Sequence, residues 1–158
     1  MTGLRCPVRR VAGAPERRSS SARPRTVNDT ARLRVFVVED NPLIRERLVE
    51  SLTATGRIDV VGQADTEYEA VEALGNTPWD ALVLDLQLRH GTGFGVLRAI
   101  GRSRPEGARI VVLTTYAIPM LRDRSLALGA DVFMDKAYEY DRAVDYLVDF
   151  AQARPAAS

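Results

Sequence analysis

Five short apolar runs alternate with amphipathic segments through most of this chain, and this alternation constrains the fold more than any other feature. Most residues in the runs are apolar and many are β-branched, which is typical of strands covered on both faces of a parallel sheet. The runs are LRVFVV (33–38), IDVVGQ (58–63), ALVLD (81–85), RIVVLT (109–114) and DVFMD (131–135). The sequence therefore predicts five parallel strands.

The segments between the runs have the apolar spacing of helices that pack on a sheet. Apolar residues recur three to five positions apart, and the predicted helices span residues 42–54, 66–75, 94–103, 118–128 and 139–152. Asn41-Pro42 is typical of a helix start, and Gly129 of the position after a helix end. Five strands alternating with five helices predict an α/β fold with a doubly wound, five-stranded parallel sheet.

Charge divides the chain into a basic tail and a mildly acidic domain. Residues 1–31 hold seven Arg and two acids among Pro and Ser, with little apolar periodicity, so we expect them to be disordered. We expect one domain over residues 32–153 and a short tail over 154–158. The basic tail resembles a transit peptide in composition and could contact an anionic surface, but a non-functional extension is the favoured interpretation.

Residue usage excludes several classes of site. The single cysteine, Cys6, excludes an internal disulfide, and a single histidine, His90, excludes His-rich metal sites. We interpret His90 as a solvated loop residue rather than a relay group. No apolar run approaches the roughly 18 residues that span a bilayer, and the first residues lack the apolar core of a secretory signal. We therefore expect a cytoplasmic protein with no membrane partner.

Polar residues gather where the predicted strands end. They are Glu39-Asp40 after the first run, Asp85 in the third, Thr114-Thr115 at the fourth and Asp135-Lys136 at the fifth. Taken alone, Glu39-Asp40 favours an ordinary turn. Because the carboxyl ends of parallel strands meet at one edge, where ligands bind, we expect all of these residues to lie together.

The residue types at this edge indicate a chemistry. Several carboxylates in one cleft require a cation, and oxygen ligands without His or thiolate favour Mg²⁺, with Mn²⁺ or Ca²⁺ as alternatives. A lysine and a hydroxyl beside them suit a phosphoryl group. A carboxylate can itself be the nucleophile and form an aspartyl phosphate, and this transfer needs mainly positioning and charge neutralisation.

Five motifs, in order, resemble the receiver domain of two-component response regulators. They are VVED (37–40), LVLDLQ (82–87), Gly93, VVLT (111–114) and FMDK (133–136). The resemblance covers about residues 33–152 and implies a flavodoxin-like receiver. Only about residues 153–158 follow the last predicted helix, too few for a DNA-binding helix-turn-helix. We therefore expect a receiver of the stand-alone type, without an output domain and without direct DNA binding, and a fragment of a larger regulator is the alternative. The resemblance also implies a switch that is no enzyme, catalysing only its own phosphorylation and dephosphorylation.

The resemblance implies a phosphoryl and metal site. Asp85 would be the phosphorylated nucleophile and Lys136 its resting partner, which binds a phosphoryl oxygen after transfer. Asp40 would bind Mg²⁺ directly and Glu39 through water. Asp85 and the backbone carbonyl of Gln87 would complete the metal ligands.

The resemblance also implies a switch and its partners. Thr114 would bind a second phosphoryl oxygen and move toward the site, and Phe133 would turn inward with it, although a plain core role suits Phe133 equally. The phosphoryl donor would be a sensor histidine kinase or a histidine phosphotransfer protein. Helix 118–128, strand 131–135 and helix 139–152 would form the switched surface, for an unknown downstream protein or a second copy.

Alternatives and departures qualify this interpretation. An aspartate-nucleophile phosphatase is one alternative, but Gln87 stands where such enzymes carry a second Asp; a phosphoryl sink or relay is another. Arg89 and Ala137 replace prolines of many receivers, so loop 86–92 is expected to be more mobile. We interpret GTGFG (91–95) as a turn into a helix, because it lacks the pattern of a phosphate-binding loop.

Overall fold

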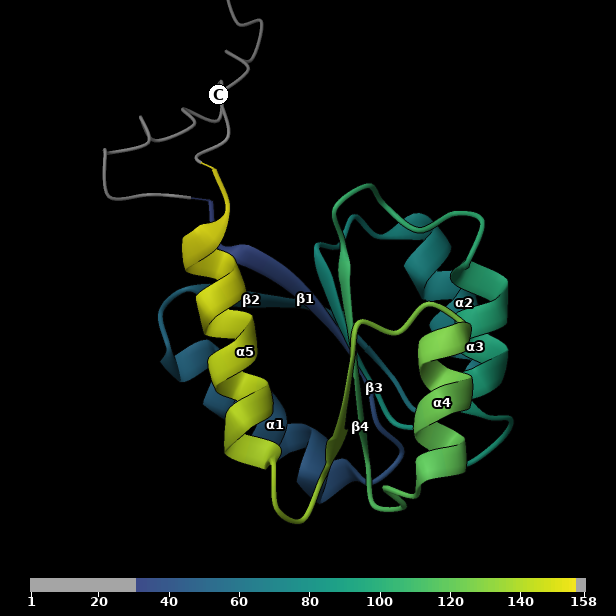
Figure 1. Cartoon of the computed structure of the whole chain (residues 1–158). Coiled ribbons are helices and arrows are strands. Elements are labelled where there is room, and N and C mark those ends of the chain that lie inside the picture. Colours follow the sequence, from purple (N-terminus) through teal and green to yellow (C-terminus); the bar gives the residue numbers. More distant parts are fainter. Residues whose placement is uncertain (1–30, 156–158) are drawn as a thin grey trace, which may run out of the picture.

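Five parallel strands form one sheet in the order β2-β1-β3-β4-β5 in the computed structural model, which describes residues 31–155 (Figure 1). The strands are β1 (Leu33–Val38), β2 (Ile58–Ala64), β3 (Ala81–Leu84), β4 (Arg109–Thr114) and β5 (Val132–Asp135). The predicted doubly wound sheet is therefore confirmed. The strand order reverses between β1 and β3, and a crevice at such a reversal is where ligands bind in open α/β sheets.

Helices cover both faces of the sheet (Figure 1). The helices are α1 (Pro42–Ala54), α2 (Glu67–Asn76), α3 (Gly93–Ile100), α4 (Pro119–Ala127) and α5 (Tyr140–Ala153). Helices α1 and α5 pack on one face, and α2, α3 and α4 on the other. The predicted helices are confirmed with shifts of one residue at most ends. The largest difference is at α3, which ends three residues early, at Ile100, where the chain enters a turn.

The strands contribute alternate side chains to two separate cores. Phe36, Leu82 and Val112 lie in the core under α2, α3 and α4. Val37 and Val83 lie in the core under α1 and α5. Because successive strand residues point to opposite faces and both faces are covered, β3 is buried at every position, which explains its unbroken apolar run.

Helix ends follow the expected local chemistry. Asn41 caps α1 by accepting from the backbone N–H groups of Leu43 and Ile44, and Pro42 is the first helical residue. Thr92 caps α3, so GTGFG is a turn into a helix as predicted. Gly129 has φ +107° directly after Leu128, the C-cap of α4, a conformation that favours glycine.

Two parts of the chain lie outside the described residues. They are residues 1–30, with Cys6 and nearly all of the expected basic tail, and residues 156–158. Between residues 31 and 155, no helix is both long enough and apolar enough to cross a membrane.

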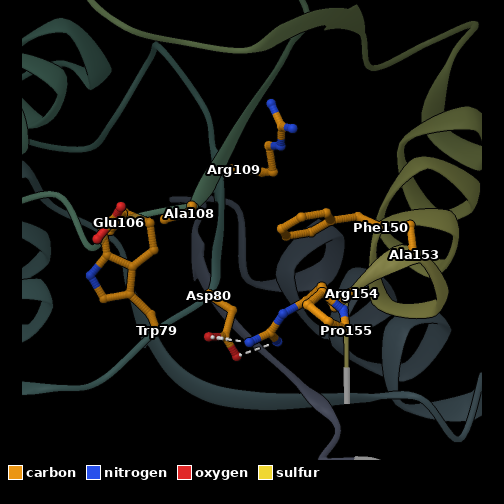
Figure 2. A pocket seen from close by; sticks show the side chains of 10 residues that line it. Trp79, Asp80, Glu106, Ala108, Arg109, Phe150, Ala153, Arg154 and Pro155 are labelled. Atoms are coloured by element: carbon orange, nitrogen blue, oxygen red, sulfur yellow. Dashed lines mark hydrogen bonds and ion pairs between the residues drawn. The ribbon is translucent and has the colours of Figure 1, made fainter. Parts of the chain in front are cut away.

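The amino-terminal end of the sheet carries an ion-pair cluster centred on Asp80. Its carboxylate accepts from the backbone N–H of Arg34 at 2.8 Å and from that residue's guanidinium. It also pairs with Arg154 at the end of α5, at 3.0 Å, beside a pocket of about 430 Å³ that Trp79 and Phe150 help to line (Figure 2). The cluster thus fastens β1, β3 and α5 together, at the end of the sheet opposite Asp85.

Candidate functional site

Three carboxylates gather at the carboxyl edge of the sheet, beside the reversal between β1 and β3. One oxygen each of Glu39, Asp40 and Asp85 lies within 4.8 Å of the others. Glu39 is 3% exposed and Asp85 5% exposed, whereas Asp40 is half-buried. The backbone N–H of Glu39 donates to Ala64 and that of Asp85 to Val38, each at 3.0 Å. The sheet ladder thus continues past the strand ends and holds both buried acids in place.

Lys136 directly follows the edge strand β5 and adds a positive charge to this cluster. Its backbone N–H donates to the carbonyl oxygen of Thr114 at 2.9 Å, which continues the pairing of β4 with β5. Its Nζ donates to Glu39 Oε2 at 2.5 Å and to Asp85 Oδ2 at 2.8 Å. The ammonium therefore bridges the two buried acids.

Burial and charge shift the pKa values of this group. Burial raises the pKa of Glu39 to about 7, because desolvation and the nearby Asp85 charge outweigh the hydrogen bond from Lys136. Burial acts to lower the pKa of Lys136, but its hydrogen bonds to Asp85 and Glu39 exceed that effect and raise the pKa. The site thus has more negative charge than one ammonium neutralises, and its all-oxygen donor set suits a hard divalent cation.

Thr114 and Phe133 lie on the neighbouring strands β4 and β5, where Phe133 pairs in register with Val112, two residues before Thr114. Thr114 is fully buried at the carboxyl end of β4, and its hydroxyl accepts from the backbone N–H of Tyr116 at 3.4 Å. Phe133 is buried in the core under α2, α3 and α4. Its inward position is compatible with both interpretations of this residue, as a switch and as a core residue.

The loop after Asp85 is fastened at both of its ends. The N–H of Gln87 donates to Asp85 Oδ1 at 3.2 Å, and Gln87 forms an antiparallel bridge with Thr92. Arg89 pairs with Asp65 at 3.3 Å, and its N–H donates to the Asp65 carbonyl at 3.4 Å. These contacts do not favour the mobility expected from the missing proline, because the connection between β2 and α2 holds the loop instead.

Besides the contact from Lys136, two further contacts to Glu39 were not predicted from sequence. The Asn41 N–H donates to Glu39 Oε1 at 3.1 Å, and Arg45 Nη1 donates to the Glu39 carbonyl oxygen at 2.8 Å. Arg45 lies in the first turn of α1. The predicted helix start at Asn41-Pro42 was therefore the one sequence signal that placed Arg45 near Glu39. His90 is exposed, in line with a solvated loop residue.

Comparisons with known proteins agree with this fold and site. The model of the response regulator receiver domain matches residues 35–147. A transcriptional regulatory protein from Mycobacterium tuberculosis, NarL, is 30% identical over 123 residues, which cover 78% of this chain and 56% of that protein. The transcriptional activator DevR/DosR of the same organism is 32% identical over 104 residues, covering 66% of this chain and 48% of that protein. The chain spans about half the length of these curated relatives.

Solved structures give the same assignment. The signal receiver domain of NarL from Mycobacterium tuberculosis has a TM-score of 0.67 at 30% identity, covering 78% of this chain and 98% of that chain. The response regulator domain of Thermotoga maritima CheB has a TM-score of 0.67 at 21% identity, which shows the shared fold alone. Since the family model extends from β1 into α5, over well more than half of the chain, the protein belongs to the response regulator receiver domains of two-component signalling, which are signalling modules rather than enzymes.

Proposed function

We propose that Asp85 accepts a phosphoryl group from a phosphohistidine on a sensor histidine kinase or a histidine phosphotransfer protein. The observation that carries this proposal is the burial of Asp85 within a three-carboxylate cluster that Lys136 contacts directly. In the reaction, a carboxylate oxygen of Asp85 attacks phosphorus, a P–O bond forms, and the P–N bond to the histidine ring breaks. The donor ring keeps the electron pair of the P–N bond and leaves as neutral imidazole with one proton taken from water, and Asp85 becomes an aspartyl phosphate.

The same cluster would hold Mg²⁺, with Mn²⁺ as an alternative. Asp40, Asp85 and the backbone carbonyl of Gln87 would bind the ion directly, and Glu39 through water. Bound Mg²⁺ would neutralise charge on the transferred group. The chain's own contribution is to hold Asp85 in line: the N–H of Gln87 fixes one carboxylate oxygen and Lys136 the other.

Phosphorylation would act as a switch through Lys136 and Thr114. Lys136 would exchange its contact with Asp85 for one with a phosphoryl oxygen, and the Thr114 hydroxyl would leave the Tyr116 N–H to bind a second oxygen. The movement of Thr114 would pass to Phe133 and change the surface of α4, β5 and α5. That surface would then bind a downstream protein or a second copy of the chain.

Turnover of free phosphate esters is the less favoured function. An aspartate-nucleophile phosphatase needs an acid/base group two residues after its nucleophile, and Gln87 offers an amide there. A phosphoryl sink or relay uses the same chemistry at Asp85 and differs only in where the phosphoryl group goes next. The DNA binding named for DevR/DosR belongs to a protein of which this chain matches about half, and we do not extend it to this chain.

Phosphorylation by acetyl phosphate tests the proposal. With Mg²⁺, intact-mass spectrometry should show one phosphoryl group on the wild-type chain, none after chelation of the metal, and none on Asp85→Asn. Asp135→Asn is the matched control, because Asp135 lies at the same edge of the sheet and, among residues 31–155, its carboxylate accepts only from the neighbouring backbone N–H of Ala137. A label that persists on Asp85→Asn would show that the nucleophile is another residue.

A further inference from the structure

The GTGFG turn after Asp85 contains an unusual helix cap. Thr92 is the N-cap of α3, and its hydroxyl accepts from the N–H of Gly95 at 3.2 Å, the first half of a capping box. In a complete capping box a Glu or Gln at the position of Gly95 would accept from the N–H of the capping residue. Gly95 has no side chain, so α3 cannot supply that second half itself.

Glu67, the first residue of α2, supplies it from another helix. Its Oε2 accepts from the Thr92 N–H at 2.8 Å, although 25 positions separate the two residues. Its own N–H donates to the His90 carbonyl oxygen at 3.0 Å. One residue of α2 thus holds the loop at two points, one on each side of Gly91.

The glycines of the turn make room for this carboxylate. A Cβ on Gly95 would overlap the carboxyl group of Glu67, and its three nearest atoms would all belong to that group. A Cβ on Gly91 would likewise meet only Glu67 among its nearest atoms. Two glycines therefore leave space for one side chain, which gives a structural reason for glycine at both positions of this turn.

The Glu67–Thr92 hydrogen bond is connected to the residues that follow Asp85 in the proposed phosphoryl site. Thr92, which Glu67 holds, is bridged to Gln87, and the N–H of Gly93 donates to the Leu86 carbonyl at 2.9 Å. Leu86 and Gln87 are the two residues that follow Asp85. The path from Glu67 to the Gln87 backbone thus runs through the Thr92 backbone, which faces Gln87 in an antiparallel bridge.

We propose that Glu67 is a positioning residue for metal binding, which caps α3 in place of Gly95 and so sets the orientation of the Gln87 carbonyl. This inference rests on the proposed function, because it assigns Gln87 to the Mg²⁺ site. Glu67 does not touch the reacting atoms. Its loss should leave the chemistry at Asp85 intact and weaken the metal site.

Mg²⁺ titrations of matched variants test the inference. Isothermal titration calorimetry should show Mg²⁺ binding about tenfold weaker in Glu67→Ala, as for other residues that orient a metal ligand. Glu67→Gln keeps the acceptor for the Thr92 N–H and should stay close to wild type. Glu69→Ala is the control, since it removes the same charge from the same helix turn, and no hydrogen bond of its carboxylate is seen in the described residues.

A second pair of variants isolates the capping geometry. Gly95→Glu alone should weaken Mg²⁺ binding, because the new side chain overlaps Glu67. In the Glu67→Ala background the same change restores a capping box within α3, and it should recover most of the lost affinity. The double variant would then bind Mg²⁺ more tightly than either single variant. Two independent destabilising changes would instead add their losses.

The kinetic signature separates positioning from a general loss of structure. The Mg²⁺ concentration for half-maximal phosphorylation by acetyl phosphate should rise about tenfold in Glu67→Ala, whereas the rate at saturating Mg²⁺ should stay near wild type. Thermal unfolding monitors the fold of every variant. If Glu67→Ala does not fold, the Mg²⁺ affinities of Glu67→Gln and of the double variant Glu67→Ala/Gly95→Glu test the positioning role.

The outcomes distinguish the two claims. If wild type binds Mg²⁺ and all variants bind it equally, the positioning role is overturned while the proposed function stands. A lower rate at saturating Mg²⁺ with unchanged affinity would also overturn the positioning role. If wild type neither binds Mg²⁺ nor becomes phosphorylated, the proposed function fails and the positioning role fails with it.

Discussion

Lys136 and Glu39 form an ion pair across 97 positions of the sequence, with Nζ and Oε2 separated by 2.5 Å and side-chain exposures of 9% and 4%. Asp85 shares the same ammonium. In residues 31–155, Lys136 is the one cation that forms a salt bridge with either acid. This shared cation holds two buried carboxylates together at the edge of the sheet.

Lys136→Met should lower the free energy of unfolding of the metal-free protein by about 3 kcal/mol, because removing one partner leaves buried charge without compensation. Mg²⁺ should restore part of this loss, since it supplies positive charge to the same carboxylates. Urea unfolding with and without Mg²⁺ measures both effects. Arg142→Met is the control: its pair with Glu139 is exposed and should contribute less than about 1 kcal/mol. Equal losses in the two variants would contradict the role of the buried pair.

Lys136→Met should also separate phosphorylation from the switch. Asp85, the proposed nucleophile, keeps its carboxylate and the hydrogen bond from Gln87, so acetyl phosphate should still modify the variant. The surface of α4, β5 and α5 should then fail to respond. Hydrogen exchange of β5 and α4 before and after phosphorylation is the measurement, and a wild-type response in the variant would count against the switch.

Stability should depend on pH through Glu39. Its pKa is raised from 4.5 to about 7, so the folded, metal-free protein binds this proton more tightly than the unfolded chain does. The resulting stabilisation is complete below about pH 4.5 and is lost as the pH rises through about 7. The free energy of unfolding of wild type, relative to that of Glu39→Gln, should therefore fall across this range.

Urea unfolding of both proteins at a series of pH values gives this difference directly, because contributions of all other groups cancel to first order. Saturating Mg²⁺ is the internal control, since the cation favours the charged form of Glu39 and should reduce the pH dependence. Parallel pH profiles of wild type and variant without metal would show that Glu39 titrates normally.

Asp80→Ala should destabilise the fold by about 2 kcal/mol and leave phosphorylation unchanged, because it leaves the Arg34 N–H without its carboxylate partner at the end of the sheet opposite Asp85. Burial acts to raise the pKa of Asp80, but hydrogen bonds from Arg34 outweigh it and lower the pKa. The stabilisation that the charged Asp80 provides is therefore present above its ordinary pKa of 3.8, and it is lost as the pH falls through the lower pKa of Asp80 in the folded protein. Urea unfolding and intact-mass phosphorylation check the two parts; slower phosphorylation would show that the two ends of the sheet are coupled.

Gly93→Ala should disturb the proposed phosphoryl site through backbone contact. The new Cβ would overlap the Asp85 carbonyl oxygen and lie 2.9 Å from Leu86 Cα, and neither atom can move without shifting the loop. We expect a loss of about 1–3 kcal/mol in stability and slower phosphorylation. Gly75→Ala, in α2 with no atom within 4 Å of its Cβ, should instead be neutral or stabilising. Thermal unfolding and initial rates of labelling compare the two; equal behaviour would contradict the steric argument.

The strands, the helices and the polar edge of the sheet were predictable from local pattern. Every residue of β3 is buried because helices cover both faces, so its burial is visible as an unbroken apolar run. All strands run parallel, so the residue after each strand lies at the same edge. That rule alone predicted that Glu39, Asp85, Thr114 and Lys136 would gather there.

The pairings within that edge were not predictable in the same way. Sequence reasoning paired Lys136 with Asp85, and only the fold shows that it also contacts Glu39. Likewise, the Arg154–Asp80 pair and the Glu67–Thr92 cap join residues 74 and 25 positions apart. Apolar periodicity reports which face of an element is buried, because it repeats within a few residues. Which charged side chain meets which depends on strand order and on loop paths, and these arise only when distant segments pack together.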